Sequence, residues 1–359
     1  MTINATGGAG GAHPVSRAGS ANVNTVAGGP PKAGKTLLAE ILALVGDELV
    51  RVEREFDSHL GSDVEIIETV GRYIAEGGGK RIRPALFLLC SRLTGYTGDR
   101  HILFASVFEL IHTATLVHDD IIDGATMRRG RSSVNSRWGS HLTVLLGDYL
   151  YLKSMTLALS ADDLRIIKIL CDITLTMIEG ELMQAERNGS IDVSEAEHME
   201  IIRRKTAVLF SGCGRVAGEM ALLPAEKVRA LTAYALNLGM AYQLVDDLLD
   251  FTATESVLGK PVASDLKEGR LTLPLIFLLE KGNPDHRQKI GSVLREGRFT
   301  TVAREEVLDL VKRHGTLERT RRLAIGYSQQ AAACLEQFEP SPVRQALTDL
   351  AFYITSRDH

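Results

Sequence analysis

The sequence lacks the paired cysteines of a disulfide-stabilised or zinc-binding protein. Its cysteines lie far apart, none forms a Cys-x-x-Cys pair, and none has a histidine at metal-binding spacing. They are Cys90, Cys171, Cys213 and Cys334. Disulfides and structural zinc are therefore not expected, and the reducing cytoplasm is the predicted location.

Features of secreted, membrane-spanning and nucleic-acid-binding proteins are also missing. The first residues contain no charged stretch followed by a long apolar one, so no signal peptide is expected. No apolar run approaches the ~20 residues that span a bilayer. The formal net charge of −4 leaves no broad basic surface for nucleic acid. Basic residues cluster instead at 80–83 and 128–131, which suits a small anionic ligand, although either cluster alone could be a solvated face.

Residues 1–35 contain almost no large apolar side chains and consist mostly of Gly, Ala, Asn, Pro and Ser. Such a segment cannot bury enough surface to offset the entropy lost on ordering, so we predict a disordered tail. The segment from Gly29 to Thr36 formally matches the phosphate-binding P-loop pattern. No buried strand precedes it, and its two prolines remove two backbone N–H groups, so a chance match is the favoured interpretation.

The alternating pattern of β-strands is hard to find, and apolar spacing from Thr36 onward is helical nearly throughout. Stripes with this spacing begin at 37–45 and recur at 64–75, 84–93, 101–123, 141–160, 163–187, 195–222, 226–251, 271–280, 304–313 and 317–338. No linker rich in Pro, Gly or Ser separates them. We predict one all-α domain over residues 36–359, a large bundle of about ten helices around a central cavity. The segments 101–123 and 226–251 are apolar on almost all sides and should be its central helices.

The most informative feature is a pair of aspartate clusters of identical form, Asp-Asp-x-x-Asp, at residues 119–123 and 246–250. Residues four apart on a helix project about 40° from each other, so the outer aspartates of each cluster share a face. Both clusters lie near the C-terminal ends of predicted helices, where the macrodipole disfavours negative charge. Six carboxylates around one cavity repel unless they are neutralised. We predict Mg²⁺, which binds one or two carboxylates together with water and phosphate oxygens.

Further polar residues accompany the clusters: His112 and Gln243 share their helix faces, Lys205 and Thr206 lie between the two helices in the sequence, and Lys260 follows the second helix. A lysine is a compact point charge suited to phosphate. Each of these lysines alone could equally be an ordinary surface residue. Together with the acidic clusters they indicate a site for a phosphorylated ligand.

In their order along the chain, these motifs resemble the trans-isoprenyl diphosphate synthases. The matching segments are residues 78–84 (Gly-Gly-Lys-Arg-Ile-Arg-Pro), His112, both aspartate clusters, 128–130 (Arg-Arg-Gly), 146–148 (Leu-Gly-Asp), Gly180-Glu181-x-x-Gln184, Lys205-Thr206 and Gln243. The resemblance runs from about residue 40 to the end and leaves out only the tail. The family commonly has proline two residues after Arg-Arg-Gly, where this chain has Ser132, so a slightly altered loop is expected there.

The resemblance implies an all-α enzyme of the isoprenoid synthase type, acting as a homodimer. It would condense isopentenyl diphosphate head-to-tail onto an allylic diphosphate, farnesyl or geranylgeranyl. Isopentenyl diphosphate would be held by Lys80, Arg83, His112 and Arg129. The allylic diphosphate would be held by Arg128, Lys205, Thr206, Gln243 and Lys260. Mg²⁺, roughly three ions once substrate is bound, would be held by Asp119, Asp123 and Asp246, with Asp120, Asp247 and Asp250 in support. The catalytic set would be Asp119, Asp123, Lys205 and Asp246.

Product length can also be argued from the resemblance. It implies that the product grows away from the first cluster along its helix, and that short-chain members close this path with an aromatic residue four or five positions before the first aspartate. Those positions hold Thr115 and Ala114, both small, so the tunnel should continue. Phe108 is a candidate for a deeper floor, or simply a core residue. We predict an octaprenyl to decaprenyl product of the kind used for quinone side chains, as in ubiquinone biosynthesis, with peripheral membrane contact for its release.

Four other functions remain as alternatives. A geranylgeranyl or other short-chain synthase would share the motifs. A phosphohydrolase of the HD type could use His118 and Asp119, but it leaves the second cluster, Lys80 and Arg83 without a role. A terpene cyclase would normally replace the second cluster by an Asn/Ser/Glu pattern, which is absent. A non-catalytic partner subunit usually loses aspartates from one cluster, and this chain keeps all six.

Overall fold

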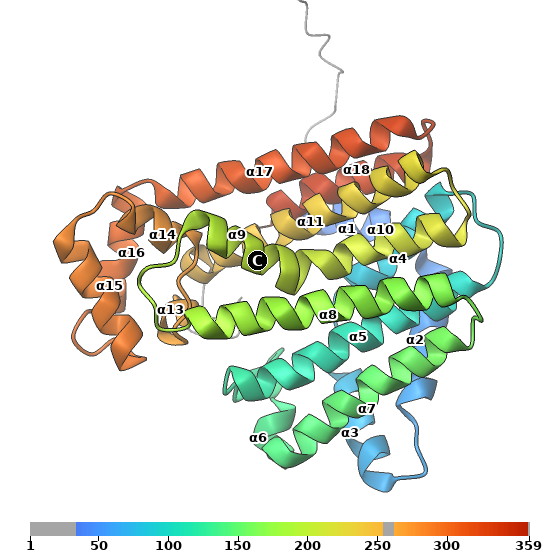
Figure 1. Cartoon of the computed structure of the whole chain (residues 1–359), viewed down its shortest axis with the longest axis horizontal. Coiled ribbons are helices and arrows are strands. Elements are labelled where there is room, and N and C mark those ends of the chain that lie inside the picture. Colours follow the sequence, from blue (N-terminus) through green and yellow to red (C-terminus); the bar gives the residue numbers. More distant parts are fainter. Residues whose placement is uncertain (1–33, 254–261, 358–359) are drawn as a thin grey trace, which may run out of the picture. The chain divides into compact units, whose positions relative to one another are not determined.

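The computed structural model describes residues 34–253 and 262–357, which are helical almost throughout (Figure 1). The first helices are α1 (Gly34–Ala43), α2 (Gly46–Leu60), α3 (Glu65–Glu76), α4 (Ile82–Leu93), α5 (Arg100–Ile122), α6 (Val134–Trp138), α7 (Ser140–Leu159), α8 (Leu164–Arg187) and α9 (Glu195–Ile202). A π-helical turn, η1 (Arg203–Ala207), leads into α10 (Val208–Met220) and α11 (Ala225–Thr252). The remaining helices are α13 (Ser264–Lys267), α14 (Leu273–Leu279), α15 (Pro284–Glu296), α16 (Arg304–Arg313), α17 (Thr316–Cys334), the 3₁₀ turn η2 (Leu335–Gln337) and α18 (Pro342–Thr355).

The predicted all-α class is confirmed, with one small exception. Two short strands, β1 (Met127–Arg128) and β2 (Arg131–Ser132), pair antiparallel between α5 and α6. The two residues that join them, Arg129 and Gly130, both have positive φ, 51° and 75°. Two-residue hairpin turns require this backbone geometry, and glycine adopts it without strain.

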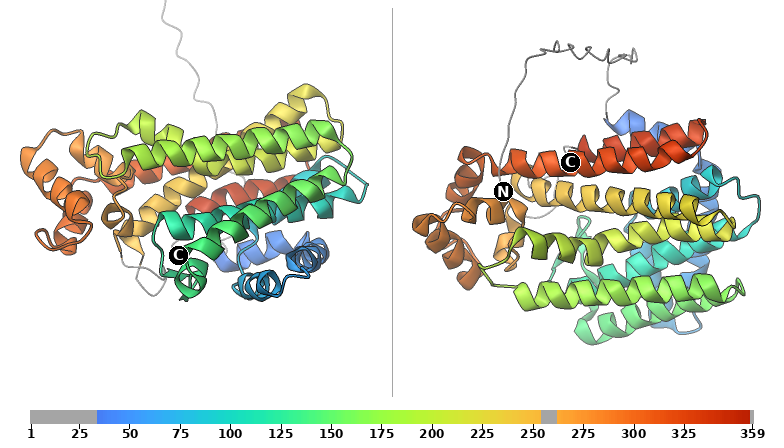
Figure 2. Two further views of the ribbon diagram at one scale, coloured as in Figure 1. Left: turned by 60° about the horizontal axis from the view of Figure 1, so that its bottom comes forward. Right: turned by 45° about the horizontal axis from the view of Figure 1, so that its top comes forward.

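Helices α5 and α11 are the central elements of the bundle, as their apolar sequences predicted. α5 packs against α7, α4 and α2, whereas α11 packs against α10 and α17. The right-hand view of Figure 2 shows α17, α11, α10 and α8 following one another in this order across the bundle. Buried side chains occur on all sides of α5 and α11, from Ile102 to Asp120 and from Val228 to Phe251. The two aspartate clusters are therefore carried by the most firmly held helices of the fold.

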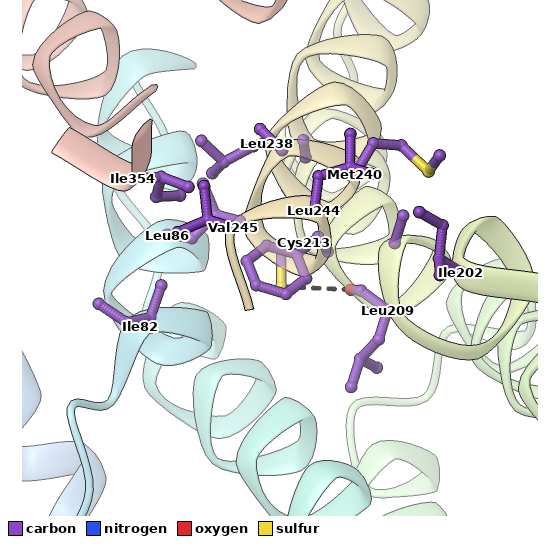
Figure 3. Packing of buried hydrophobic residues seen from close by; sticks show 14 of the residues in the cluster. Ile82, Leu86, Ile202, Leu209, Cys213, Leu238, Met240, Leu244, Val245 and Ile354 are labelled. Atoms are coloured by element: carbon purple, nitrogen blue, oxygen red, sulfur yellow. Dashed lines mark hydrogen bonds between the residues drawn. The ribbon is translucent and has the colours of Figure 1, made fainter. Parts of the chain in front are cut away.

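The core near the site forms where four helices meet. Figure 3 shows Leu86 of α4, Cys213 of α10, Val245 of α11 and Ile354 of α18 pointing toward one another. All four are at most 3% exposed. Burying one leucine, isoleucine or valine side chain contributes about 1.5–3 kcal/mol. This packing fixes α11 against α4 and α10, and so fixes the second aspartate cluster in space.

Two helices that begin with proline were missed by the sequence analysis, which expected no helix between 280 and 304 and none after 338. α15 begins with Pro284 after the capping residue Asn283, and α18 begins with Pro342 after the capping residue Ser341. Proline suits the first helical position because its missing N–H would have no partner there and its φ is already helical. Both prolines therefore start helices, and the expected total of about ten helices was too low.

Helix α2 was also missed, because its sequence is mostly charged and polar. Its buried residues, Val52, Phe56 and Leu60, are spaced four apart on one face. Such a narrow apolar stripe is enough to dock a helix on the bundle. The stripe stands out less than the broad apolar stretches elsewhere in the chain.

The predicted tail and most of the formal P-loop match lie outside the described residues. Only their end is described: α1 begins at Gly34, two residues before the predicted start of the domain at Thr36. Residues 34 and 35 therefore belong to a helix, and their assignment to the tail was wrong.

The expectation that no stretch could span a bilayer was too strong. Among the described residues, α5 and α7 are long and apolar enough to cross a membrane, judged by length and composition alone. In α5, 67% of the most apolar window is buried inside the bundle, but in α7 only 33% is buried. A core helix of a soluble protein passes the same test, so α5 carries no further weight, whereas the apolar surface of α7 needs an explanation.

Candidate active site

The last turns of α5 and α11 open on one cavity of about 360 Å³. Asp119 and Asp123 line it from α5, and Asp246 and Asp247 line it from α11. The two aspartate clusters thus face the same space, as their shared form predicted. The other lining residues include Arg128, Gln184, His198, Lys205, Thr206, Gln243, Asp265, Arg270 and Thr272.

Asp119 is the least compensated carboxylate of the first cluster. No hydrogen bond or ion pair of its side chain occurs among the described residues. Burial raises the pKa of Asp119 to about 6, Lys205 opposes this shift, and the carboxylates of Glu181 and Asp123 add to it. A raised carboxyl pKa means that the site disfavours the charged form until a cation arrives.

The other aspartates of this cluster have basic partners. Asp120 is buried and accepts a short hydrogen bond from Nε of Arg128. Oδ1 of Asp123 lies 2.7 Å from Nη1 of Arg270. Asp120 does not line the cavity, and it anchors the hairpin residue Arg128.

In the second cluster, the two aspartates that line the cavity both have partners. Oδ1 of Asp246 lies 3.2 Å from Nη2 of Arg357, near the end of α18. Burial raises the pKa of Asp246, Arg357 opposes this, and Asp247 adds to it. Asp247 has both oxygens occupied: Oδ2 lies 2.8 Å from Nε2 of His198, and Oδ1 accepts from Nε2 of Gln243 at 3.2 Å.

Asp250 does not line the cavity but fixes the segment after it. Its Oδ1 accepts hydrogen bonds from the hydroxyl and backbone N–H of Ser264, at 2.9 and 3.2 Å. Its Oδ2 accepts from the backbone N–H of Asp265 at 3.2 Å. Asp250 thereby caps the short helix α13 and holds Asp265 at the cavity wall.

The carboxylates suit a magnesium ion that shares its ligands with a substrate. In the described part of the chain, no three histidine, cysteine or acidic residues approach closely enough to form a complete metal cage. Magnesium does not need one, because it usually takes one or two carboxylates plus water and phosphate oxygens. Asp119, Asp123 and Asp246 offer that partial ligand set around a cavity with room for a diphosphate.

Lys205 and Thr206 lie on the π turn η1, where one continuous helix from 195 to 222 was expected. Nζ of Lys205 lies 2.6 Å from Oε2 of Glu181. The hydroxyl of Thr206 donates to Oε1 of Gln243 at 3.0 Å. A π turn inserts an extra residue into a helix and often marks a functional site. Here the π turn places two consecutive residues, Lys205 and Thr206, on the cavity lining.

Helix α8 passes so close to η1 that only glycine fits at the contact. A Cβ on Gly180 would lie 2.6 Å from the backbone nitrogen of Lys205 and 2.7 Å from Cβ of Arg204. Real Cβ atoms essentially never come so near to other heavy atoms. Gly180 thus sets the distance at which Glu181 meets Lys205.

The residues predicted to hold isopentenyl diphosphate lie outside the lining of the acidic cavity. Nη1 of Arg83 is 3.0 Å from Nε2 of His112. A guanidinium has no acceptor, so this nitrogen of His112 accepts and the ring is neutral. Burial, followed by the charges of Arg83 and Arg129, lowers the pKa of His112 well below its usual value. Lys80 is exposed in the segment between α3 and α4.

Arg129 reaches a smaller pocket of about 70 Å³ beneath the β1–β2 hairpin. Burial lowers its pKa, and the neighbouring Arg81 and Arg128 lower it further, while Glu109 opposes them. The predicted change of loop at Ser132 falls on β2, whose Ser132 carbonyl accepts from the hydroxyl of Tyr73 at 2.7 Å. Lys260 lies outside the described residues.

The predicted product-length residues occupy two different environments. Ala114 is 3% exposed and belongs to an apolar cluster with Leu146 and Leu150 of α7. Thr115 is partly exposed and donates its hydroxyl to the carbonyl of His112 at 2.7 Å. Phe108 is fully buried, and the centre of its ring lies 5.4 Å from that of Phe87. These contacts are those of a core residue, the second of the two roles considered for Phe108.

The sequence analysis missed two arginines and a histidine of this site. Arg270 joins Asp123 to Asp265, which lies 2.9 Å from its Nη2, and Arg357 pairs with Asp246. His198 supports Asp247. Arg270 could have been found, because it follows the second cluster in a short segment of alternating charges before Leu271-Thr272-Leu273. Arg357 and His198 had no such signal, since only the packing of α18 and α9 brings them to the cavity.

This geometry can be compared with known proteins. The sequence signature of the family described as polyprenyl synthetase matches residues 64–311. The chain belongs to the polyprenyl synthetase family. It is 36% identical to octaprenyl diphosphate synthase of Escherichia coli (strain K12) over 321 residues, 89% of this chain and 99% of that protein.

Solved structures of polyprenyl synthases have the same fold. A polyprenyl synthase from Caulobacter crescentus CB15, complexed with calcium and isoprenyl diphosphate, is 33% identical, with a TM-score of 0.87 over 92% of this chain and all of that one. A decaprenyl diphosphate synthase from Rhodobacter capsulatus is 35% identical, with a TM-score of 0.84 over 90% and 99%. The protein is therefore an enzyme, a trans-prenyltransferase that builds polyprenyl diphosphates. The phosphohydrolase and terpene cyclase alternatives are excluded.

Proposed function

We propose that this polyprenyl synthetase is magnesium-dependent and extends farnesyl or geranylgeranyl diphosphate with isopentenyl diphosphate to an octaprenyl to decaprenyl length. The single observation that carries the proposal is the shared cavity of the two aspartate clusters, lined also by Lys205, Thr206, Gln243 and Arg270. Acidic and basic groups around one space of this size suit a diphosphate with divalent cations.

The reaction separates charge, because diphosphate leaves an allylic carbon as an anion. Magnesium bound at this site supplies positive charge to the departing oxygens. Asp119, Asp123 and Asp246 hold the cations, and Lys205 and Arg270 add fixed positive charge from the protein. Fixed charges in a site with little water stabilise such a transition state without reorganising. The calcium in the Caulobacter crescentus relative supports a divalent cation here.

The attacking group is the double bond of isopentenyl diphosphate, which needs positioning and no activation by a side chain. We assign its diphosphate to Lys80, Arg83, His112 and Arg129. His112 is neutral, so it contributes orientation of Arg83 and no charge of its own. Lys260 is the remaining candidate for the allylic diphosphate, together with Arg128.

A long product is supported by the small residues before the first cluster. Neither Thr115 nor Ala114 can close a tunnel as an aromatic residue would. The relatives from Escherichia coli and Rhodobacter capsulatus are an octaprenyl and a decaprenyl diphosphate synthase. Products of this length serve as quinone side chains, so ubiquinone biosynthesis is the proposed pathway. A short-chain synthase remains the second candidate.

We further propose a cytoplasmic homodimer without a membrane-spanning segment, which touches the membrane only to release its product. Apolar side chains spaced seven apart stay exposed along α7: Leu145 by 61%, Leu152 by 63% and Leu159 by 53%. On α8, Leu175 and Leu182 are 59% and 66% exposed. Apolar stripes of this kind usually mark an interface between proteins, and a symmetric dimer would cover them.

The proposed activity is tested with purified protein, farnesyl diphosphate, radiolabelled isopentenyl diphosphate and Mg²⁺. Reverse-phase chromatography of the products should give an octaprenyl to decaprenyl diphosphate, and chelation of the metal should abolish it. A geranylgeranyl product would support the short-chain alternative. Binding of both substrates without any product would overturn the proposed activity.

A further inference from the structure

Two ion pairs join α8 to the π turn, one on each side of the closest contact between them. Toward the cavity, Oε2 of Glu181 lies 2.6 Å from Nζ of Lys205. Away from it, Oε2 of Glu179 lies 2.5 Å from Nη1 of Arg204. The pairs are alike in distance and in the elements that they connect. They differ in what surrounds them.

The Glu181–Lys205 pair is held in a fixed place. Its side chains are only 21% and 26% exposed, whereas Glu179 is 48% exposed. Gly180 brings the two backbones together between the pairs. Lys205 lines the cavity and Glu181 does not, so Glu181 stands behind the lysine, in the wall.

Without Glu181, the lysine would have other carboxylates to bind. Lys205 lines the same cavity as Asp119, Asp123 and Asp246. A lysine side chain is long and flexible, and its ammonium pairs with whichever anion is nearest. An ammonium bound to Asp119 would compete with a divalent cation for the same oxygens.

We propose that Glu181 is a positioning residue that holds Lys205 beside the diphosphate site and away from Asp119, so that the aspartate stays open to metal. This inference rests on the proposed function. It assigns to Glu181 no contact with substrate and no metal of its own. Glu181 acts through Lys205 alone, and that is the property to test.

The test compares Glu181→Gln with Glu179→Gln, which removes the matched outward pair. Glu181→Gln should lower kcat/KM for the allylic diphosphate about tenfold and raise the half-saturating Mg²⁺ concentration several-fold. Glu179→Gln should leave both unchanged. Equal unfolding temperatures of the two variants would show that the difference is not one of folding. Glu181→Asp, which keeps the charge but shortens the reach, should give an intermediate loss. If the two glutamine variants have the same kinetics, Glu181 has no positioning role.

A double-mutant cycle with Lys205→Gln distinguishes positioning from direct metal binding. If Glu181 acts through Lys205, adding Glu181→Gln to Lys205→Gln should cause no further loss. Losses that multiply would mean that Glu181 binds metal or substrate itself, and the proposal would be wrong.

Binding of inorganic diphosphate with Mg²⁺, measured by calorimetry, gives a readout that does not depend on prenyl transfer. Glu181→Gln should weaken it several-fold and Glu179→Gln should not. If the wild-type protein binds magnesium diphosphate but transfers no prenyl group, the proposed function fails while this inference can still be decided. Unchanged binding in Glu181→Gln would overturn the inference alone.

Discussion

At the scale of single residues, the cavity brings like charges together and compensates them unequally. Asp120 and Asp123 have arginine partners, and so has Asp246. Asp247 is held by neutral or weakly basic groups, and Asp119 has no partner at all among the described residues. A carboxylate without a partner destabilises the folded protein when it is ionised. Asp119 is therefore the residue whose charge matters most, both to stability and to metal binding.

Replacing Asp119 by asparagine should stabilise the metal-free protein and abolish its activity. The pKa of Asp119 is about 6 in the folded protein and ordinary in the unfolded one. The unfolded chain therefore binds fewer protons in this window, and the stability of the wild type falls as pH rises from about 4 through about 6. One pKa unit corresponds to about 1.4 kcal/mol, and solvent screening reduces this, so Asp119→Asn should gain ~1–2 kcal/mol at pH 7.

This prediction is checked by urea unfolding of metal-free protein at pH 4 and pH 7, together with the prenyl transfer assay. The gain should be present at pH 7 and nearly absent at pH 4, and transfer should fall by at least about 100-fold. Asp172→Asn is the control, because Asp172 lies exposed on α8 in a pair with Lys168. A variant no more stable than wild type at pH 7 would contradict the raised pKa.

An aromatic residue before the first cluster should shorten the product, and the two candidate positions should differ in stability. Thr115 is partly exposed, so Thr115→Phe should close the path without overpacking. Ala114 is buried against Leu146 and Leu150, so Ala114→Phe should shorten the product but also cost about 1–3 kcal/mol of stability. Product sizing and thermal unfolding separate the effects. An unchanged product length in both variants would disprove the floor argument.

At the scale of elements, the sequence predicts helices well where apolar residues repeat over many turns. α5 and α11 were predicted to within a residue at each end, and with them the two clusters. α15 and α18 were both missed, and each begins with a proline, which can be the first residue of a helix as well as a break. The π turn could not be predicted, since its extra residue depends on the contact between α8 and η1. Thus Lys205 was found from its motif, but its geometry and its partner Glu181 required the packed structure.

The contact between α8 and η1 should tolerate no side chain at Gly180. In Gly180→Ala the new methyl group would push on the backbone of Lys205, which cannot move aside as a flexible side chain can. We expect activity to fall at least about tenfold, with a loss of ~1–3 kcal/mol in stability. Gly326→Ala is the control, because a Cβ there meets nothing within 4 Å and alanine favours helix.

Kinetics with farnesyl diphosphate and thermal unfolding decide this prediction. Gly326→Ala should be as active as wild type and at least as stable. If Gly180→Ala keeps full activity and stability, the π turn can move without loss of either. The close contact between α8 and η1 would then not determine the geometry of the site.

At the scale of the whole molecule, the apolar stripes lie close to the cavity: α8 contributes to both, and α7 packs against a helix that lines the cavity. α8 carries Glu181 on the wall of the site and Leu182 next to it, 66% exposed. α7 packs along α5, which carries the first cluster. A partner that covered α7 and α8 would hold these walls from outside. In the proposed homodimer, assembly and activity should therefore be coupled, although each protomer contains the cavity formed by the described residues.

An arginine in either stripe should separate the proposed dimer into monomers. Leu152→Arg and Leu182→Arg each place a charge at a position that is exposed in the protomer, so folding should survive. In a dimer the same charge would be buried without a partner, which costs several kcal/mol. Because a symmetric dimer buries the new arginine of both protomers, this cost applies twice. Association should therefore weaken by far more than 100-fold. Sedimentation at micromolar concentration should give a dimer for wild type and monomers for both variants, with reduced prenyl transfer. Phe352→Arg is the control, since Phe352 is exposed by 43% on α18, which packs against α17 and α4. A dimer that survives both leucine changes must use another face, and the stripes on α7 and α8 would then need a different partner.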